Sequence, residues 1–388
     1  MQFSSRNLIT GAAADNSSIK DLREAVLGSG SAGLVVQTYA NTILQQPDIT
    51  LPADLLAKIP VDVFLKTART HADNYLNNIQ PGIINTIQDV NGYSTQFSSF
   101  NKVISQSINT WKMGNNLTAK QEALDLLKQL QIGLTSKQNK VILVSKDLGK
   151  LLLDLNGDVA NFTTAVSTAD IEIGADSKVI GDLENTISSF DSKIAGAASG
   201  VALSGLVAIG GGLLIVVGAG LTPFTFGAST GLIVAGAAVV VVGAGGLTAS
   251  SVVLSSLISG KSDAIRQKAI LTDDLNALHL LKPAFVNLQS SASNAIAQVN
   301  NMANAWNILG GNLGNVIGSI SDAQTFSDLP VVVQAYLDTA NDQWADVKTA
   351  VQTINQQMTG VQTKILKDGN GKLIQLNNES ILTAAEAA

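Results

Sequence analysis

The stretch that decides the fold of this chain lies at residues 194–260 and reads IAGAASGVALSGLVAIGGGLLIVVGAGLTPFTFGASTGLIVAGAAVVVVGAGGLTASSVVLSSLISG. It contains no Asp, Glu, Lys, Arg or His in 67 residues. The segment TPFTFG at 222–227 divides it into two apolar arms, 194–221 and 228–259, which contain twelve and thirteen Leu, Ile or Val residues. A helix of about 20 residues crosses the ~30 Å hydrocarbon core of a bilayer. The stretch therefore predicts an apolar helical hairpin whose two flanks stay on one side of a membrane.

Three settings could accommodate such a hairpin: a buried core pair, a permanent membrane anchor, or a segment that inserts only on contact with lipid. A surface helix of a soluble protein usually has one polar face, and neither arm has a charged one. The rest of the chain contains no other apolar run of this length, which is unusual for an anchored protein. We therefore favour the conditional segment. In the soluble protein it must fold back on the body or pair with other copies, and of these we expect self-association.

Composition narrows the possible partners. The 388 residues are 46% hydrophobic but only 4% aromatic and 14% charged, with a net charge of −6. An acidic chain lacks the basic face that nucleic acids require and the positive charge that attracts anionic lipid. There is no cysteine, so disulfides and thiolate chemistry are excluded. Residues 1–8 lack a sustained apolar core, so we predict no conventional secretory signal.

The residues before the apolar stretch indicate long helices. Six residues recur at steps of seven, a spacing typical of helix packing: Leu76, Ile83, Val90, Phe97, Ile104 and Trp111. They predict a helix at 61–113, kinked at Pro81, where the backbone N–H is missing. A longer helix is expected at 118–193, with a capping box formed by Thr118 and Gln121.

The residues after the apolar stretch repeat this pattern. A return helix is expected from residue 261, bent at Pro283, and another helix starts near Pro330. Trp306 and Trp344 lie about four helical turns on either side of the loop at 321–328. Antiparallel neighbours joined by a short loop bring such positions to one level, so both indoles should face the interior side by side. Residues 367–372 predict a small hairpin turn.

The N-terminal region is expected to be a loose arm at 1–16 followed by helices at 19–27 and 32–46. Residues 28–33 match GxGxxG, but they follow a helix and not a strand, so we interpret them as a flexible linker. The predicted fold class is all-α: an elongated antiparallel bundle of about five long helices with an apolar helical hairpin at one tip. Residues 1–193 and 261–388 would form the bundle, and 194–260 the membrane-inserting head.

The sequence offers little chemistry for catalysis. His71 and His279 lie on predicted helices without a metal-ligand spacing, and no phosphate-binding Walker loop is present. We predict no catalytic, metal-binding or cofactor-binding residue, and therefore no enzyme.

Long helices flanking an uninterrupted apolar hairpin resemble the cytolysin A-type alpha pore-forming toxins, which include haemolytic and non-haemolytic enterotoxin components of Bacillus. The long uncharged head, divided at 222–227, looks most like the B component of the tripartite toxins of Gram-negative bacteria. The resemblance implies a secreted, soluble form that inserts into a target-cell membrane. The flanking helices would then continue through 201–221 and 232–257.

The residues expected to enter the membrane are the large apolar ones of the head and its bend: Val201, Leu203, Leu206, Val207, Ile209, Leu213, Leu214, Ile215, Val216, Val217, Leu221, Pro223, Phe224, Phe226, Leu232, Ile233, Val234, Val239, Val240, Val241, Val242, Leu247, Val252, Val253 and Leu254. The hinges are expected at Gly196, Gly200, Ser256 and Gly260, where small residues tolerate a bend.

The head offers only Ser and Thr for the polar wall of a water-filled pore. We therefore expect one or two related toxin subunits with amphipathic heads, in addition to other copies of this chain and target-membrane lipid. No nucleic acid and no cofactor are expected. Two other functions remain open on the sequence alone: a coiled-coil scaffold with a permanent membrane anchor, and a pore-forming bacteriocin.

Overall fold

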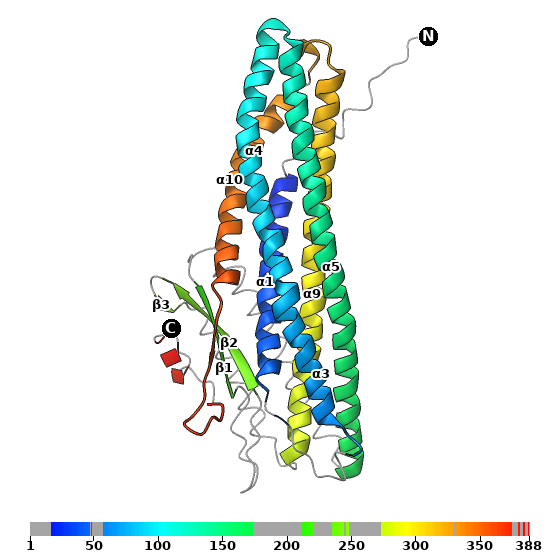
Figure 1. Cartoon of the computed structure of the whole chain (residues 1–388), viewed down its shortest axis with the longest axis vertical. Coiled ribbons are helices and arrows are strands. Elements are labelled where there is room, and N and C mark those ends of the chain that lie inside the picture. Colours follow the sequence, from blue (N-terminus) through cyan, green and yellow to red (C-terminus); the bar gives the residue numbers. More distant parts are fainter. Residues whose placement is uncertain are drawn as a thin grey trace, which may run out of the picture. The chain divides into compact units, whose positions relative to one another are not determined.

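The computed structural model describes residues 17–46, 48, 57–173, 212–219, 235–243, 246–247, 273–329, 331–374, 379–380, 383–384 and 387 (Figure 1). The helices are α1 Ser17–Leu44, α3 Val61–Asn74, α4 Gln80–Gly114, α5 Leu117–Ile173, α9 Asp273–Asp322 and α10 Val331–Thr359. A π-helical turn, η1, spans Tyr75–Ile79, and a 3-10 turn, η3, spans Phe326–Asp328. The strands are β1 Gly212–Ala219, β2 Ala235–Gly243, β3 Gly246–Leu247 and β4 Gln362–Ile365.

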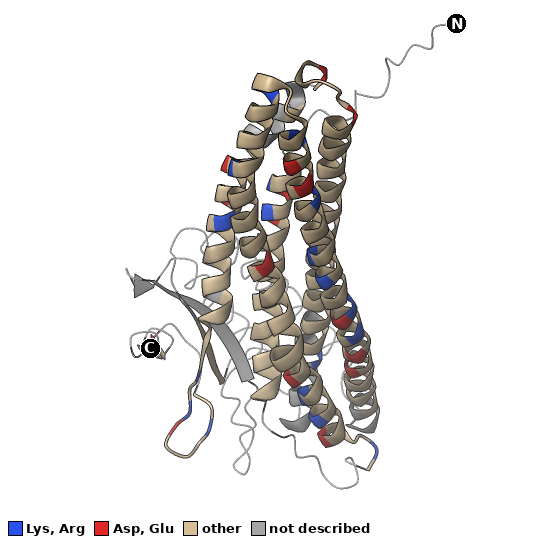
Figure 2. Cartoon of the chain, turned by 45° about the horizontal axis from the view of Figure 1, so that its top comes forward, with Lys and Arg blue, Asp and Glu red and all other residues tan. Residues whose placement is uncertain are grey.

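The predicted bundle of about five long helices is confirmed. Within the described ranges, α1, α4, α5, α9 and α10 contain 28, 35, 57, 50 and 29 residues. Acidic and basic residues are interspersed along these helices (Figure 2). The predicted continuations of α5 to residue 193 and of α9 back to residue 261 lie outside the described residues.

The chain divides into two compact units. Unit 1 comprises Met1–Ser29, Ile83–Ser145 and Ala297–Asn355, and unit 2 comprises Gly30–Gly82, Lys146–Ile296 and Gln356–Ala388. Each unit is described by itself below.

Unit 1 has an aromatic core at the centre of its helices. The Trp306 and Trp344 rings stack with centroids 6.2 Å apart, and Tyr93 contacts both, at 5.4 Å and 5.1 Å. The Ser94 hydroxyl donates to the Trp344 carbonyl at 2.9 Å, which fixes α4 against α10. The prediction that the two indoles lie at one level inside the bundle is therefore confirmed. The predicted loop is also correct, since α9 ends at Asp322 and α10 begins at Val331.

The predicted packing stripe of α4 is buried: Ile83, Val90, Phe97, Ile104 and Trp111 are all at most 3% exposed. The predicted helix end near residue 113 is also confirmed, since α4 ends at Gly114 and Asn115 lies in the left-handed region at φ 49°.

The start of α5 differs from the prediction. The cap is the Asn116 side chain, which accepts a hydrogen bond from the Ala119 backbone N–H at 3.1 Å, and α5 already includes Thr118. An Asn side chain in the N-cap position satisfies one free N–H of the first turn. Thr118 lies too far into the helix to do so, and the predicted capping box is wrong.

Unit 2 contains the turn that precedes Pro81. The π-helical turn Tyr75–Ile79 comes directly before Gln80 and Pro81, and such turns mark helix kinks. Tyr75 is fully buried, and its hydroxyl donates to the Gly33 carbonyl at 2.7 Å. Burial raises the Tyr75 pKa well above its usual range. This π-helical turn agrees with the predicted kink at Pro81.

A second aromatic cluster packs α3, α5 and α9 together in unit 2. Phe162 lies between Phe64 and Phe285, with ring centroids at 6.3 Å and 4.2 Å. The same two helices, α3 and α5, also carry an ion pair. His71 Nδ1 and Asp158 Oδ2 are 2.8 Å apart, and the Asp158 side chain is only 1% exposed. His71 therefore has a structural partner, as its lack of metal-ligand spacing indicated.

The predicted linker at residues 28–33 is wrong, because these residues lie within α1. Burial and close packing explain why these residues are helical. Ser29 is fully buried and its hydroxyl donates to the Ala25 carbonyl at 2.8 Å, inside the helix. A Cβ at Gly28 would collide with the Gln298 side chain, so Gly28 serves close packing in unit 1. Burial of this face outweighs the weak helix propensity of Gly and Ser.

The predicted C-terminal hairpin is confirmed. Lys367 and Leu373 form an antiparallel bridge. The Asp368 carboxylate accepts from the backbone N–H groups of Asn370 and Lys372, both at 2.9 Å. Gly371 has φ +82°, a conformation that favours glycine.

Candidate functional site

The described part of the apolar stretch forms a β-sheet in unit 2. The strand order is β3-β2-β1-β4. β1 pairs antiparallel with β2, with Leu214 opposite Val240, and parallel with β4, with Val216 opposite Lys364. The Leu366 N–H continues the second ladder by donating to the Val217 carbonyl at 2.8 Å. β1 is therefore an internal strand, paired along both edges.

The side chains at the centre of β1 are buried on both faces of the sheet. Leu214, Ile215, Val216 and Val217 are 2%, 1%, 0% and 0% exposed. Successive residues of a strand point to opposite faces, so both faces are covered. This burial takes place within a single chain. Self-association is therefore not needed to remove the centre of β1 from water. In the structure, this part of the stretch is folded back and buried within its own chain.

The prediction of a helical hairpin is wrong for residues 212–219 and 235–243, which are strands in this form of the protein. The reason lies in the residues themselves. LLIVV and VVVV are dominated by β-branched side chains, which lose rotamer freedom in a helix and pack well in a sheet. A fully apolar run carries no period that separates a buried strand from a buried helix.

Ten of the predicted membrane-inserting residues lie in this sheet: Leu213, Leu214, Ile215, Val216, Val217, Val239, Val240, Val241, Val242 and Leu247. The others lie outside the described residues: Val201, Leu203, Leu206, Val207, Ile209, Leu221, Pro223, Phe224, Phe226, Leu232, Ile233, Val234, Val252, Val253 and Leu254. The predicted hinges Gly196, Gly200, Ser256 and Gly260 also lie outside them.

The sequence reasoning missed β4 and its pairing with β1. Gln362–Ile365 is a short segment of mixed polarity next to the predicted hairpin turn, and each of its residues pairs with a β1 residue 148 positions earlier in the chain. Only its position between a long helix and a turn could have marked it as a strand. No pattern in the sequence identifies β1 as the partner strand of β4. The Lys364 ammonium donates to the Ala384 carbonyl at 3.2 Å, which adds a second contact from the C-terminal region.

The sheet can shield apolar side chains from water, but β1 and β2 offer no reactive groups. β1 and β2 contain no ionisable side chain, so proton transfer has no donor or acceptor there. Across the described ranges, no cluster of three His, Asp or Glu residues suits a metal ion. None of the helices in those ranges combines the length and hydropathy needed to cross a membrane.

Comparisons with known proteins agree with this architecture. The family model for the Bacillus haemolytic enterotoxin (HBL) matches residues 16–197. No curated protein matches the chain.

Solved structures match over nearly the whole chain. Soluble AhlB of the tripartite alpha-pore forming toxin AHL from Aeromonas hydrophila is 27% identical, with a TM-score of 0.78 over 95% of this chain and 99% of that one. Soluble SmhB of the tripartite toxin Smh from Serratia marcescens is 22% identical, with a TM-score of 0.78 over 95% and 99%. The AhlB pore is 25% identical, with a TM-score of 0.56 over 89% of this chain and 99% of that one.

The structure is thus more similar to the soluble state of AhlB than to its pore state. The helical bundle and the enterotoxin match over residues 16–197 make this chain similar to alpha pore-forming toxins, with an architecture like that of soluble AhlB.

Proposed function

We propose that this chain is a pore-forming toxin component, described here in its soluble form, that inserts residues 194–260 into a target-cell membrane and assembles into a lytic pore. The observation that supports it most strongly is the match of one relative, AhlB, in both a soluble and a pore state. The shielded β1 strand supports the same proposal, because an apolar segment kept out of water inside the chain remains available for lipid.

The sheet must open before the head can enter a bilayer. In hydrocarbon, every backbone N–H and C=O must be paired within the structure. An open sheet of four strands leaves edges that violate this rule, whereas a helix pairs all its groups internally. We therefore infer that β1 leaves β2 and β4, and that the stretch becomes the helical hairpin that its length permits. Gly196, Gly200, Ser256 and Gly260 are the proposed hinges of this change.

The same proposal assigns a role to each part of the chain. Residues 194–260 are the inserting head, and residues 1–193 and 261–388 are the body that remains outside the bilayer. The action is physical and not catalytic. The partners are target-membrane lipid, further copies of this chain, and one or two related subunits that supply the charged or polar wall of the pore. The protein acts outside the cell that produces it.

A disulfide across β1 and β4 tests the opening step. Val216 and Lys364 are register partners on adjacent strands, and the chain has no cysteine of its own. The double variant Val216→Cys/Lys364→Cys, oxidised, should not lyse target cells in the presence of the partner subunits, and reduction should restore lysis. Each single-cysteine variant is the matched control and should lyse under both conditions.

Two results would contradict the proposal. Full lysis by the oxidised double variant, with the disulfide verified by mass spectrometry, would show that β1 does not need to leave β4. A wild-type chain that releases no dye from liposomes, alone or with lysate of the producing cell, would show that the protein is not a pore component.

A further inference from the structure

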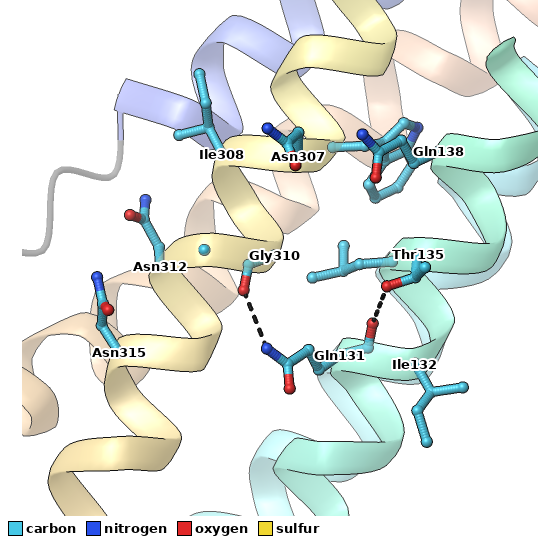
Figure 3. A pocket seen from close by; sticks show the side chains of 12 residues that line it. Gln131, Ile132, Thr135, Gln138, Asn307, Ile308, Gly310, Asn312 and Asn315 are labelled. Carbon is cyan, nitrogen blue, oxygen red and sulfur yellow. Dashed lines mark hydrogen bonds between the residues drawn. The ribbon is translucent and has the colours of Figure 1, made fainter.

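A cavity of about 670 Å³ lies in unit 1, between the 131–138 segment of α5 and the 306–315 segment of α9 (Figure 3). Its volume falls within the range of small-molecule sites, about 300–1,000 Å³. The residues of the cavity do not belong to the apolar head, residues 194–260.

The side chains around the cavity carry no charge, and half of the twelve lining residues are polar. Six of them carry an amide or a hydroxyl: Gln131, Thr135, Gln138, Asn307, Asn312 and Asn315. None of the twelve lining residues is Asp, Glu, Lys, Arg or His. Each amide presents both hydrogen-bond donors and acceptors. A ligand with hydroxyl groups, which donate and accept at once, matches this lining, whereas a charged ligand would find no counter-charge.

The polar groups of the cavity are only loosely engaged. Gln131 Nε2 donates to the Gly310 carbonyl at 3.3 Å, and the Thr135 hydroxyl donates to the Gln131 carbonyl at 3.3 Å (Figure 3). Asn312 Nδ2 donates to the Ser18 hydroxyl at 3.2 Å. These distances are at or beyond the long end of the usual range. The groups are therefore positioned by the protein and can exchange these bonds for shorter ones to a ligand.

One buried donor at the cavity has no acceptor. Trp306 lines the cavity and is 1% exposed, and its indole Nε1 has no hydrogen-bond partner among the described residues. A buried N–H without an acceptor is rare in folded proteins and carries a desolvation cost. The ring itself is fixed by its stacking on Trp344. The indole ring is thus a rigid part of the cavity wall, whereas its N–H is buried in the protein and is not accessible to a ligand.

Two adjacent glycines keep the cavity open. Gly310 and Gly311 line it from within α9, where glycine is less favourable than alanine. A Cβ at either position would meet no atom within 4 Å, so packing against the protein does not explain them. A side chain at these positions would occupy open space, which at Gly310 and Gly311 is the space of the cavity.

From these observations we propose that the cavity binds a neutral, hydroxyl-rich ligand, such as a hexose unit of a glycan. The exposed rims fit such a ligand, because Ile132 is 70% and Ile308 is 49% exposed and both line the cavity. Apolar rims pack against the C–H faces of a sugar ring, while the side-chain amides bind its hydroxyls. This binding site does not depend on the proposed pore formation and is tested without a membrane.

The test is saturation-transfer NMR on the full-length protein with free glucose, galactose, mannose, N-acetylglucosamine and N-acetylgalactosamine, and with N-acetylneuraminic acid as the charged comparison. At least one neutral sugar should receive saturation, and the charged sugar should not. Gly310→Leu should abolish the transfer. Gly318→Leu is its matched control, since Gly318 lies on α9, has equally open surroundings and does not line the cavity.

A second pair of variants tests an amide of the cavity. Gln138→Leu should weaken the Kd of the bound sugar about 3- to 10-fold, as expected for loss of one neutral hydrogen bond. Gln121→Leu, on the same helix but outside the cavity, should leave the Kd unchanged. The absence of transfer to every neutral sugar would overturn the proposal, and so would equal transfer in Gly310→Leu and Gly318→Leu. Cross-linking of the cavity rim to a protein, without sugar binding, would reassign the surface to protein docking and also reject the glycan site.

Discussion

The aromatic core of unit 1 and the β1 sheet of unit 2 are stabilised by different kinds of contact. In unit 1, the shapes of Tyr93, Trp306 and Trp344 fit together between three helices. In unit 2, β1 is bound to β2 and β4 by backbone pairing, and its buried side chains are simple aliphatic ones. Backbone pairing can be exchanged for a helix of the same residues, whereas an aromatic core loses its complementarity when it is rearranged. Under the proposed function, the sheet is therefore the part that converts and the aromatic core the part that persists.

The largest effect is expected from a charge at the centre of β1. Val216→Asp should abolish lysis, because a charge at mid-bilayer costs about 2.5–3.5 kcal/mol on the translocon scale. The same charge also disturbs the sheet, since Val216 is fully buried. The three tryptophans of unit 1 should keep their wild-type fluorescence. Val63→Asp is the control, at a valine that is 54% exposed on α3, and should lyse normally. Retained lysis and liposome flotation by Val216→Asp would remove β1 from the inserting segment.

The next effect is expected in the aromatic core. Trp344→Ala should lower the free energy of unfolding by about 3–5 kcal/mol, as for other large-to-small changes in a core. It should leave the lipid affinity of the head itself little changed, because Trp344 lies outside the inserting stretch. Urea unfolding followed by far-UV circular dichroism measures the first quantity, and liposome flotation measures the second. A loss below about 1 kcal/mol would mean that unit 1 is not governed by aromatic packing.

The difference between the two regions also explains what the sequence could predict. The helices of the bundle follow from heptads such as Val90, Phe97 and Ile104, because one buried face imposes a period on the chain. The apolar stretch has no polar face and therefore no period, so its strands at 212–219 and 235–243 could not be distinguished from helices. Its length and absence of charge still predict a membrane-inserting segment, and this prediction remains a proposal.

Two further features required the three-dimensional structure. The glycines and serines of 28–31 are helical because their burial in α1 outweighs local propensity. The cavity beside Trp306 depends on polar residues of α5 and α9 that lie far apart in the sequence and that look like ordinary solvent-facing positions.

A smaller effect is expected at the buried aspartate of unit 2. Burial raises the pKa of Asp158, against the lowering effect of the His71 contact, and Asp154 raises it further. Because the folded-state pKa lies above the ordinary value of 3.8, the folded protein binds this proton more tightly than the unfolded chain. Stability should therefore fall as pH rises from about 3.8 through the raised pKa.

Asp158→Asn should remove this pH-dependent loss while keeping a hydrogen bond to His71. The measurement is the urea midpoint from circular dichroism at acidic and neutral pH, for the variant and the wild type. If the two proteins showed the same pH profile, Asp158 would not be a group that destabilises unit 2 when charged.

The smallest effect is expected at Asp89 of unit 1, where the sign is opposite. Partial burial would raise the Asp89 pKa, but hydrogen bonds and charge from Lys137 and Lys140 lower it overall. A lowered folded-state pKa contributes stability above the ordinary value of 3.8, and that contribution is lost as pH falls through the folded-state pKa. Lys140 is 54% exposed, so solvent screens the pair and Asp89→Asn should cost at most about 1 kcal/mol at neutral pH. The urea midpoint of Asp89→Asn should approach that of the wild type at acidic pH. A cost several times larger at neutral pH would show that unit 1 depends on its charges as well as on its aromatic core, and would weaken the contrast between the two units.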